Sequence, residues 1–350
     1  LDAIALIPGS NFKYLTGGNF PLMERPTLFI ITKNQNVAIL PSLEVDSFNQ
    51  LDIDSKIISW HDKDGFNQAF KEASKILGDI KNIGVEGQKI RFFETQAFKE
   101  NFKEIEIINS HKEISSIRLN KEQDEINILI EAIKISEKSL ESTLNYIKLG
   151  MSELQVKQFL MQELYKNGAE GLSFDPIVLT GQNSALPHGH SSNQNMIKQG
   201  DTLLFDFGAT IKSYKADITR TFFMIESDEY QRKAYETVRL ANEIGIQKSK
   251  LPNSLHDVDH ETTLILENSD FEEFIVHKTG HGLGLDVHED PYVVRGNDTK
   301  LEQGMVITVE PGLYIPQKFG IRIEDDVLIT NDLPNVLTSF SKELRIINNE

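Results

Sequence analysis

Short apolar runs alternate with helical periods along the first third of the chain. The runs at residues 3–7, 27–32, 37–41, 57–60, 83–86 and 105–108 have the length and composition of strands. Residues 66–77 repeat apolar side chains at helical spacing up to Gly78, and residues 88–102 contain a second such period. This alternation predicts a small α/β domain over residues 1–115.

The pattern changes near residue 115, where we place a domain boundary. Residues 121–149 carry apolar side chains at helical spacing, with Asn120 as the expected N-cap and Gly150 at the end. Ser152 and Gln155 have the spacing of a capping box, which predicts a second helix to about residue 166. Strands are then expected at 174–179, 201–211 and 216–225, the last two forming a hairpin that turns near residues 213–214.

The same order of elements recurs in the last part of the chain. Helices are expected at 228–250 and 254–268, followed by strands at 274–277, 305–314 and 320–330. The stretch from Leu203 to Gly208 also resembles the stretch from Ile307 to Gly312 in its pattern. We infer that residues 116–350 hold two copies of one ααβββ unit, related by a pseudo-two-fold axis. Each copy would supply one hairpin to a shared centre.

The predicted hairpins carry an acidic residue on each arm, and a histidine lies in a glycine-rich turn between them. These residues are Asp206, Asp217, Glu310, Glu324 and His281. Carboxylates among apolar strand residues require an interaction that offsets their desolvation, and together they repel one another. Two divalent cations would balance four negative charges, and this ligand set suits Mn²⁺, Co²⁺ or Zn²⁺. Ions about 3.5 Å apart can share a bridging water, lower its pKa and so make a hydrolytic centre.

Other polar residues near these segments are candidates for substrate binding or proton transfer. His188 precedes the Asp206 strand and His288 follows His281 by seven residues, so either could stabilise an oxyanion or carry protons. Arg322 would share a strand face with Glu324 and could orient carboxylates or hold a substrate carboxylate. The simplest interpretation of Glu289-Asp290 and Asp325-Asp326 is a solvated face.

Charge and composition exclude several classes of function. The formal net charge of −17 argues against nucleic acid or anionic membranes as partners. The chain has no cysteine, which excludes disulfides and thiol catalysis and fits a cytoplasmic location. No apolar run approaches the ~20 residues of a membrane span. The chain starts at Leu1 rather than Met, so we expect that residues precede it.

Residues ~118–335 resemble the pita-bread metallopeptidase family, in the branch that contains Xaa-Pro dipeptidase (prolidase) and aminopeptidase P. The resemblance implies that Asp206 binds one metal ion, that His281 and Glu310 bind the other, and that Asp217 and Glu324 bridge the two. It makes Glu310 the candidate general base. It also implies that His188, His288 and His277 belong to the catalytic site, and it places Tyr214 and Arg322 among the residues that line it. Lys278 departs from the signature, which more often has Gly or Arg there. Residues 1–115 resemble the branch's creatinase-like N-terminal domain in length and alternation.

The family implies hydrolysis of the peptide bond before a proline at the second position of a small peptide, by a metal-bridging hydroxide, in a homodimer. A creatinase-like hydrolase, a methionine aminopeptidase and a non-catalytic partner-binding protein are the alternatives. The first and last have typically lost metal ligands that this chain keeps, and the second usually lacks the N-terminal domain. A dipeptidase must exclude longer peptides, for instance by binding the C-terminal carboxylate, and the sequence does not show such a device. The choice between dipeptidase and aminopeptidase P therefore stays open.

Overall fold

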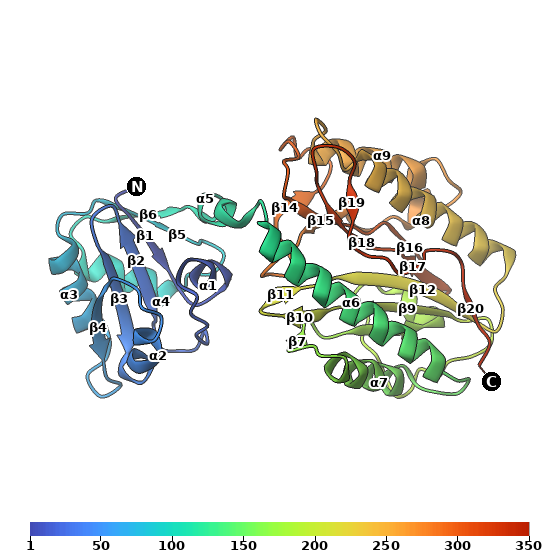
Figure 1. Ribbon diagram of the computed structural model, residues 1–350, viewed down its shortest axis with the longest axis horizontal. Coiled ribbons are helices and arrows are strands. Elements are labelled where there is room, and N and C mark those ends of the chain that lie inside the picture. The colour runs from blue at the N-terminus through green and yellow to red at the C-terminus, as the bar shows by residue number, and fades with distance from the viewer. Residues whose placement is uncertain (350) are drawn as a thin grey trace. The chain divides into compact units, whose positions relative to one another are not determined.

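The computed structural model describes residues 1–349, which fall into two compact units with the boundary between Arg118 and Leu119. The first unit is built on a six-stranded mixed sheet with the order β4-β3-β2-β1-β5-β6 (Figure 1). Its strands are β1 (Ala3–Leu6), β2 (Leu28–Thr32), β3 (Asn36–Pro41), β4 (Lys56–Trp60), β5 (Asn82–Val85) and β6 (Glu106–Asn109). All six were predicted, within two residues at each end.

Helices cover both faces of this sheet. They are α1 (Ser10–Thr16), α2 (Val45–Asn49), α3 (Asn67–Leu77), α4 (Phe92–Asn101) and α5 (His111–Ser115). Successive strand residues face opposite sides of a sheet, so each strand contributes to two apolar layers. Phe70 of α3 and Phe98 of α4 pack in one layer, and Phe12 of α1 and Phe48 of α2 pack in the other. This arrangement confirms the predicted α/β fold, whereas the short helices α1, α2 and α5 were not predicted.

The second unit begins with the two predicted helices, α6 (Gln123–Tyr146) and α7 (Glu153–Lys166). The capping box of Ser152 and Gln155 is confirmed. The prediction of Asn120 as the cap of α6 is wrong, because Glu122 caps that helix in a box with Glu125. Asn120 instead forms an isolated β-bridge with Met305, and its amide donates to Glu302.

Six strands follow in the first half of this unit. They are β7 (Gly171–Leu172), β8 (Ile177–Thr180), β9 (Thr202–Phe207), β10 (Ala209–Ile211), β11 (Tyr214–Lys215) and β12 (Ile218–Met224). The predicted hairpin is present: β9 pairs antiparallel with β12, and β10 pairs with β11. It turns at Lys212 and Ser213, whose φ angles of 47° and 71° are the left-handed values that a tight hairpin turn requires.

The second half repeats this order with differences. It contains α8 (Glu229–Lys248), α9 (Leu255–Glu267), β13 (Gly280–Gly282), β14 (Glu289–Val293), β15 (Val306–Val309), β16 (Gly312–Ile315), β17 (Phe319–Arg322), β18 (Asp325–Leu328), β19 (Asn335–Val336) and β20 (Ile346–Ile347). The strand predicted at 274–277 does not form. β13 and β14 were missed, because β13 is a three-residue Gly-His-Gly segment with an irregular register, which has no apolar signal.

The two halves confirm the predicted repeat. In Figure 1 the α6–α7 pair and the α8–α9 pair lie on opposite sides of the strands. One apolar core joins α6 and α7 to β9 and β12, and a second joins α8 to β16 and β17. The hairpins of both halves therefore lie between two helical layers. No helix within residues 1–349 is long and apolar enough to cross a membrane.

Candidate metal centre

The hairpin of the first half places Asp206 and Asp217 near each other. Asp206 pairs with Thr219 in the β9–β12 ladder, and Asp217 precedes β12 by one residue. Between β9 and β10 the chain passes Gly208, where a Cβ atom would lie 1.8 Å from the backbone oxygen of Ala216. Only glycine permits this approach of the two arms, and the approach leaves both carboxyl groups at the interruption of the ladder.

The hairpin of the second half is interrupted at the equivalent point. The predicted strand 305–314 divides into β15 and β16 at Glu310-Pro311, because proline lacks the N–H that a ladder needs. The predicted strand 320–330 divides opposite this point, so the ladder passes from the pair Val309–Asp325 to the pair Gly312–Arg322. Glu310 and Glu324 lie in this gap. Glu324 N donates to Thr219 O at 3.1 Å, which joins the two hairpins.

His281 on β13 completes the cluster. Its Nε2 lies 3.6 Å from Asp217 Oδ2 and 3.4 Å from Glu310 Oε1. Ligand atoms of Asp206, Asp217 and Glu324 lie within 4.8 Å of one another, as do those of His281, Glu310 and Glu324. The structure thus brings together all five residues that the sequence indicated as metal ligands.

Three buried carboxylate oxygens in this cluster have no hydrogen-bond partner among the described residues: Asp206 Oδ1, Asp217 Oδ1 and Glu324 Oε1. A buried polar atom without a partner is rare and costly. Glu324 is held on one side only, where its Oε2 accepts from Thr219 Oγ1 at 2.7 Å. Several carboxylate oxygens thus face one another close to a histidine nitrogen. Hard or borderline divalent cations prefer such ligands, so the residues present fit metal ions.

Burial and mutual repulsion raise the pKa values of the clustered acids. Desolvation is the largest cause for Asp217 and Glu310, followed in both by the charge of Glu324, and each pKa lies well above its usual range. Desolvation and the charge of Asp206 raise the pKa of Glu324 to about 8. Without cations the cluster therefore retains protons near neutral pH, and divalent cations would displace them.

Hydrogen bonds direct His281 toward the acids as a neutral ligand. Its Nδ1 donates to Gly282 O at 3.1 Å, which leaves the lone pair of Nε2 facing Asp217 and Glu310. Burial lowers the pKa of His281 to about 3. The ring of His288 is 3.9 Å from that of His281 between centroids, so His288 stands beside the cluster.

Arg322, Tyr314 and His277 form a chain of hydrogen bonds that ends at Asp206. Arg322 Nη2 pairs with Asp206 Oδ2, and Nη1 donates to Tyr314 Oη at 2.5 Å. Tyr314 in turn donates to His277 Nε2 at 2.9 Å, because His277 Nδ1 donates to Lys278 O. Arg322 Nε bonds to Thr219 Oγ1. The guanidinium of Arg322 is therefore occupied in orienting a predicted metal ligand. Sequence reasoning did not assign Tyr314, although it pairs with Gly320, two residues from Arg322 on β17.

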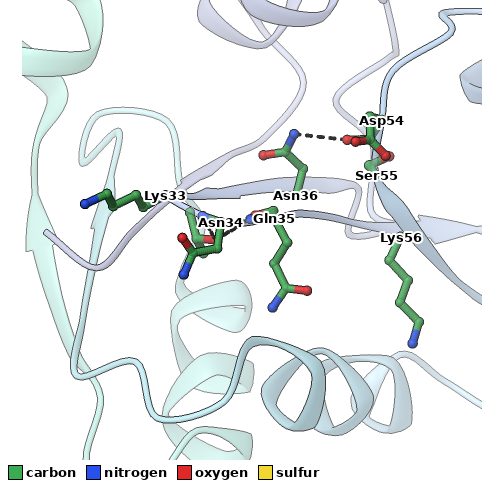
Figure 2. Close-up of a pocket in the computed structure, with 8 residues that line it drawn as sticks. Lys33, Asn34, Gln35, Asn36, Asp54, Ser55 and Lys56 are labelled. Atoms are coloured by element: carbon green, nitrogen blue, oxygen red, sulfur yellow. Dashed lines mark hydrogen bonds between the residues drawn. The ribbon is translucent and has the colours of Figure 1, made fainter.

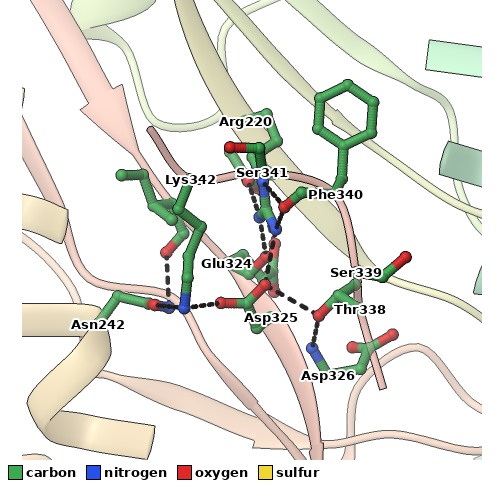
Figure 3. Close-up of polar contacts among 12 residues, drawn as sticks. Arg220, Asn242, Glu324, Asp325, Asp326, Thr338, Ser339, Phe340, Ser341 and Lys342 are labelled. Atoms are coloured by element: carbon green, nitrogen blue, oxygen red, sulfur yellow. Dashed lines mark hydrogen bonds and ion pairs between the residues drawn. The ribbon is translucent and has the colours of Figure 1, made fainter. Parts of the chain in front are cut away.

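The expectation of a solvated face at Glu289 and at Asp325-Asp326 is wrong, because these carboxylates are buried. Figure 3 shows Asp325 between Arg220 and Lys342, at 2.7 Å and 2.9 Å. Burial alone would raise the pKa of Asp325, but the two cations outweigh it and lower the pKa. Arg220 Nη1 also donates to the backbone oxygen of Glu324 at 2.5 Å.

Two further buried contacts support the same region. Asp326 Oδ2 accepts from Asp217 N at 3.3 Å. Lys121 Nζ donates to Glu289 Oε1 at 2.6 Å, next to His288. Asp326 and the Arg220–Asp325 pair thus hold the backbone of Asp217 and Glu324, and Glu289 is paired with Lys121 rather than facing solvent.

The cluster opens into a cavity of about 410 Å³. All predicted site residues except Tyr214 line it, including His188 on the loop after the 3₁₀ turn Gly181–Ala185, His277 and His288. The structure does not bring Tyr214 to this cavity, and its hydroxyl donates to Glu125 at 2.6 Å. Lys278 also lines the cavity and had no predicted role.

A larger cavity, of about 560 Å³, lies in the first unit along the ends of β2, β3 and β4 (Figure 2). Its eight lining residues include a single carboxylate, Asp54, and no histidine. The amide of Asn36 donates to Asp54 O at 3.0 Å. Its size exceeds that of the cavity at the cluster, but it does not offer a comparable set of ligand atoms.

The fold and the cluster together define a metal-dependent hydrolase with a carboxylate-rich centre. Residues 127–331 match metallopeptidase family M24, and residues 1–120 match the creatinase/prolidase N-terminal domain. The chain belongs to metallopeptidase family M24.

Related proteins match most of the chain. The Xaa-Pro dipeptidase of Pyrococcus furiosus is 35% identical over 279 residues, which cover 79% of this chain and 78% of that protein. The structure of an Xaa-Pro dipeptidase from Bacillus anthracis superposes with a TM-score of 0.90 at 33% identity, covering 99% of this chain and 95% of the other. An X-Pro aminopeptidase from Thermotoga maritima gives a TM-score of 0.83 at 30% identity, covering 99% and 97%.

Proposed function

We propose that this protein hydrolyses the peptide bond between an N-terminal residue and a following proline in small peptides. The observation that carries the proposal is the buried cluster of four carboxylates and His281, open to a cavity of about 410 Å³. The similarity to proteins named Xaa-Pro dipeptidase and X-Pro aminopeptidase supports the choice of substrate.

Two divalent cations are proposed as cofactors, with Mn²⁺ as the first candidate and Co²⁺ or Zn²⁺ as alternatives. They would be held by Asp206, Asp217, His281, Glu310 and Glu324. Asp217 and Glu324 each belong both to the group of ligand atoms that contains Asp206 and to a group that contains His281, which supports a bridging role for both. Bound there, such cations would act as Lewis acids and lower the pKa of water toward neutrality.

The side chains around the cluster would transfer protons and stabilise negative charge during hydrolysis. In this proposal water forms the new C–O bond to the scissile carbonyl, and Glu310 accepts the proton that the water loses. The same proton then passes to the proline nitrogen as the C–N bond breaks. His288 and His188 would donate hydrogen bonds to the carbonyl oxygen as it becomes negative. His277 would act through Tyr314 and Arg322, which hold Asp206.

This arrangement suits a bond to proline for a simple physical reason. The proline nitrogen carries no hydrogen, so a peptidase that binds the substrate through that N–H fails on it. The groups around this cluster would act on the carbonyl oxygen and on the leaving nitrogen, and none of these steps needs the missing N–H.

Hydrolysis of Gly-Pro, Ala-Pro and Ala-Pro-Ala by purified protein tests the proposal. We expect cleavage of the Xaa-Pro bond in the dipeptides, the tripeptide or both, and we expect this activity to be lost after metal stripping and restored by Mn²⁺ or Co²⁺. Full activity in the presence of a chelator, or activity only on peptides without proline, would contradict it. The homodimer and the cytoplasmic location stay predictions.

A further inference from the structure

Two cationic side chains, Arg322 and Lys278, line the cavity at the cluster. Arg322 cannot serve a substrate, because it is 3% exposed and its three nitrogens bond to Thr219, Tyr314 and Asp206. The sequence-based suggestion that Arg322 holds a substrate carboxylate therefore loses its support. Of the lysine and arginine side chains that line the cavity, Lys278 is therefore the one left to meet an anionic group of a substrate.

No carboxylate among residues 1–349 lies within ion-pair distance of the Lys278 ammonium, and the nearest negative charge that acts on it is that of Glu310. Lys278 Nζ lies 3.8 Å from the centroid of the Tyr292 ring, a cation–π contact. Such a contact contributes ~0.5–1 kcal/mol at exposed sites, less than a charge-assisted hydrogen bond. A carboxylate entering the cavity would therefore be a better partner for this ammonium than the tyrosine ring.

Hydrogen bonds hold the backbone around Lys278. The carbonyl oxygen of Lys278 accepts from His277 Nδ1 at 2.8 Å, and the next amide, Thr279 N, donates to Asp259 Oδ1 at 3.0 Å. Glu310 N bonds to Thr279 O at 2.7 Å. The base of the lysine is thus tied to the segment that carries a predicted metal ligand.

We propose that Lys278 binds the C-terminal carboxylate of the substrate and so makes the enzyme a dipeptidase. The proposal rests on the proposed function. In an Xaa-Pro dipeptide three covalent bonds separate the carboxylate carbon from the scissile carbonyl carbon, so the two atoms lie within ~4 Å of each other. A cation that lines the same cavity can reach that group. In a longer peptide an amide occupies this position, so the ammonium gains no charged partner.

Steady-state kinetics with a matched pair of substrates tests this. Ala-Pro carries a free carboxylate and Ala-Pro-amide does not, while the scissile bond is the same. We expect the metal-loaded protein to prefer Ala-Pro in kcat/KM, and Lys278→Met to lower that value by about 10- to 100-fold, the range of one hydrogen bond to a charged group. The loss should appear as a higher KM for Ala-Pro, whereas kcat/KM for Ala-Pro-amide should change by less than about 3-fold. Lys278→Arg should restore most of the kcat/KM for Ala-Pro.

Lys318→Met is the control, because Lys318 Nζ also lies over a tyrosine ring, that of Tyr230 at 4.9 Å, away from the cluster cavity. It should keep the preference for Ala-Pro. Metal content is measured on every variant. Unchanged metal content shows that Lys278→Met acts on the binding of the substrate carboxylate and not on the binding of cations at the centre.

The possible failures are distinguishable. An equal loss on both substrates, or an unchanged ratio between them in Lys278→Met, would overturn the role of Lys278 while leaving Xaa-Pro hydrolysis intact. Cleavage of neither substrate by the metal-loaded wild type would refute the proposed function, and the role of Lys278 with it.

Discussion

Replacement of Asp217 by asparagine should have opposite consequences in the metal-free and metal-loaded protein. Asp217 is 3% exposed, and its Oδ1 has no hydrogen-bond partner. Burial and the charges of Glu324 and Asp206 raise its pKa well above the usual range, so without metal this carboxyl group keeps its proton. Asparagine is uncharged and similar in size to a protonated aspartate. We expect metal-free Asp217→Asn to lie within about 1 kcal/mol of the wild type, the scale of one neutral hydrogen bond.

The metal-loaded protein should lose most of its additional stability. A cation at 100 times its Kd stabilises the folded state by about 2.7 kcal/mol. For a unit of this size, each kcal/mol raises Tm by ~2–4 °C, so the wild type should gain roughly 5–11 °C. Asp217 contributes to two of the three groups of ligand atoms. Its neutral replacement should therefore reduce the metal-induced gain to below about 2 °C.

Calorimetry of metal-stripped protein with and without MnCl₂, together with elemental analysis, measures both effects. Asp201→Asn is the control, because Asp201 is a partly buried carboxylate bonded to Thr180 and Lys198, outside the cluster. It should retain the full metal-induced shift whatever its own stability. A full shift and full metal content in Asp217→Asn would refute the assignment of this residue.

Three further predictions concern the surroundings of the cluster. His288→Ala should keep wild-type metal content while kcat falls by about 10²-fold, the scale of one lost oxyanion donor; loss of metal would show that His288 is a ligand instead, as its place beside Asp217 and His281 permits. Asp325→Asn should destabilise the protein by about 3–5 kcal/mol in chemical denaturation, because it leaves buried Arg220 without its counter-charge. The control is Asp62→Asn, which removes the exposed ion pair with Arg25 and should leave Tm unchanged. The metal-free protein should lose stability as pH rises from ~4.3, the pKa of an unfolded glutamate, to about 8, the pKa of Glu324 in the folded state. The reason is that the folded state binds one more proton than the unfolded state in this range. Thermal unfolding that is independent of pH in this window would contradict the raised pKa.

The hydrophobic pattern alone predicted most of the fold, because long amphipathic helices and apolar strands have strong periodic signals. It failed where short segments are held by tertiary contacts. Asn120 has the residue type of a helix cap, yet its backbone bridges to Met305. β13 has three residues and two glycines, so nothing in its sequence distinguishes it from a turn.

The candidate ligands were predictable because acids at matched positions of two similar hairpins contradict the apolar character of the strands around them. The residues that hold these ligands in place were not predictable. Asp325 resembles any surface acid until the fold places Arg220, 105 residues earlier in the chain, and Lys342 beside it. The sequence around Tyr314 and Lys278 does not indicate a role for either residue, because each role depends on which side chains lie next to it in the folded protein.

The central claim is that the five residues of the cluster hold two divalent cations. Anomalous diffraction at the manganese edge, from crystals of protein loaded with Mn²⁺, tests it most directly. The account predicts two peaks, one next to Asp206 and one next to His281 and Glu310, with Asp217 and Glu324 between them. Peaks elsewhere in the molecule, or none at these carboxylates, would contradict it.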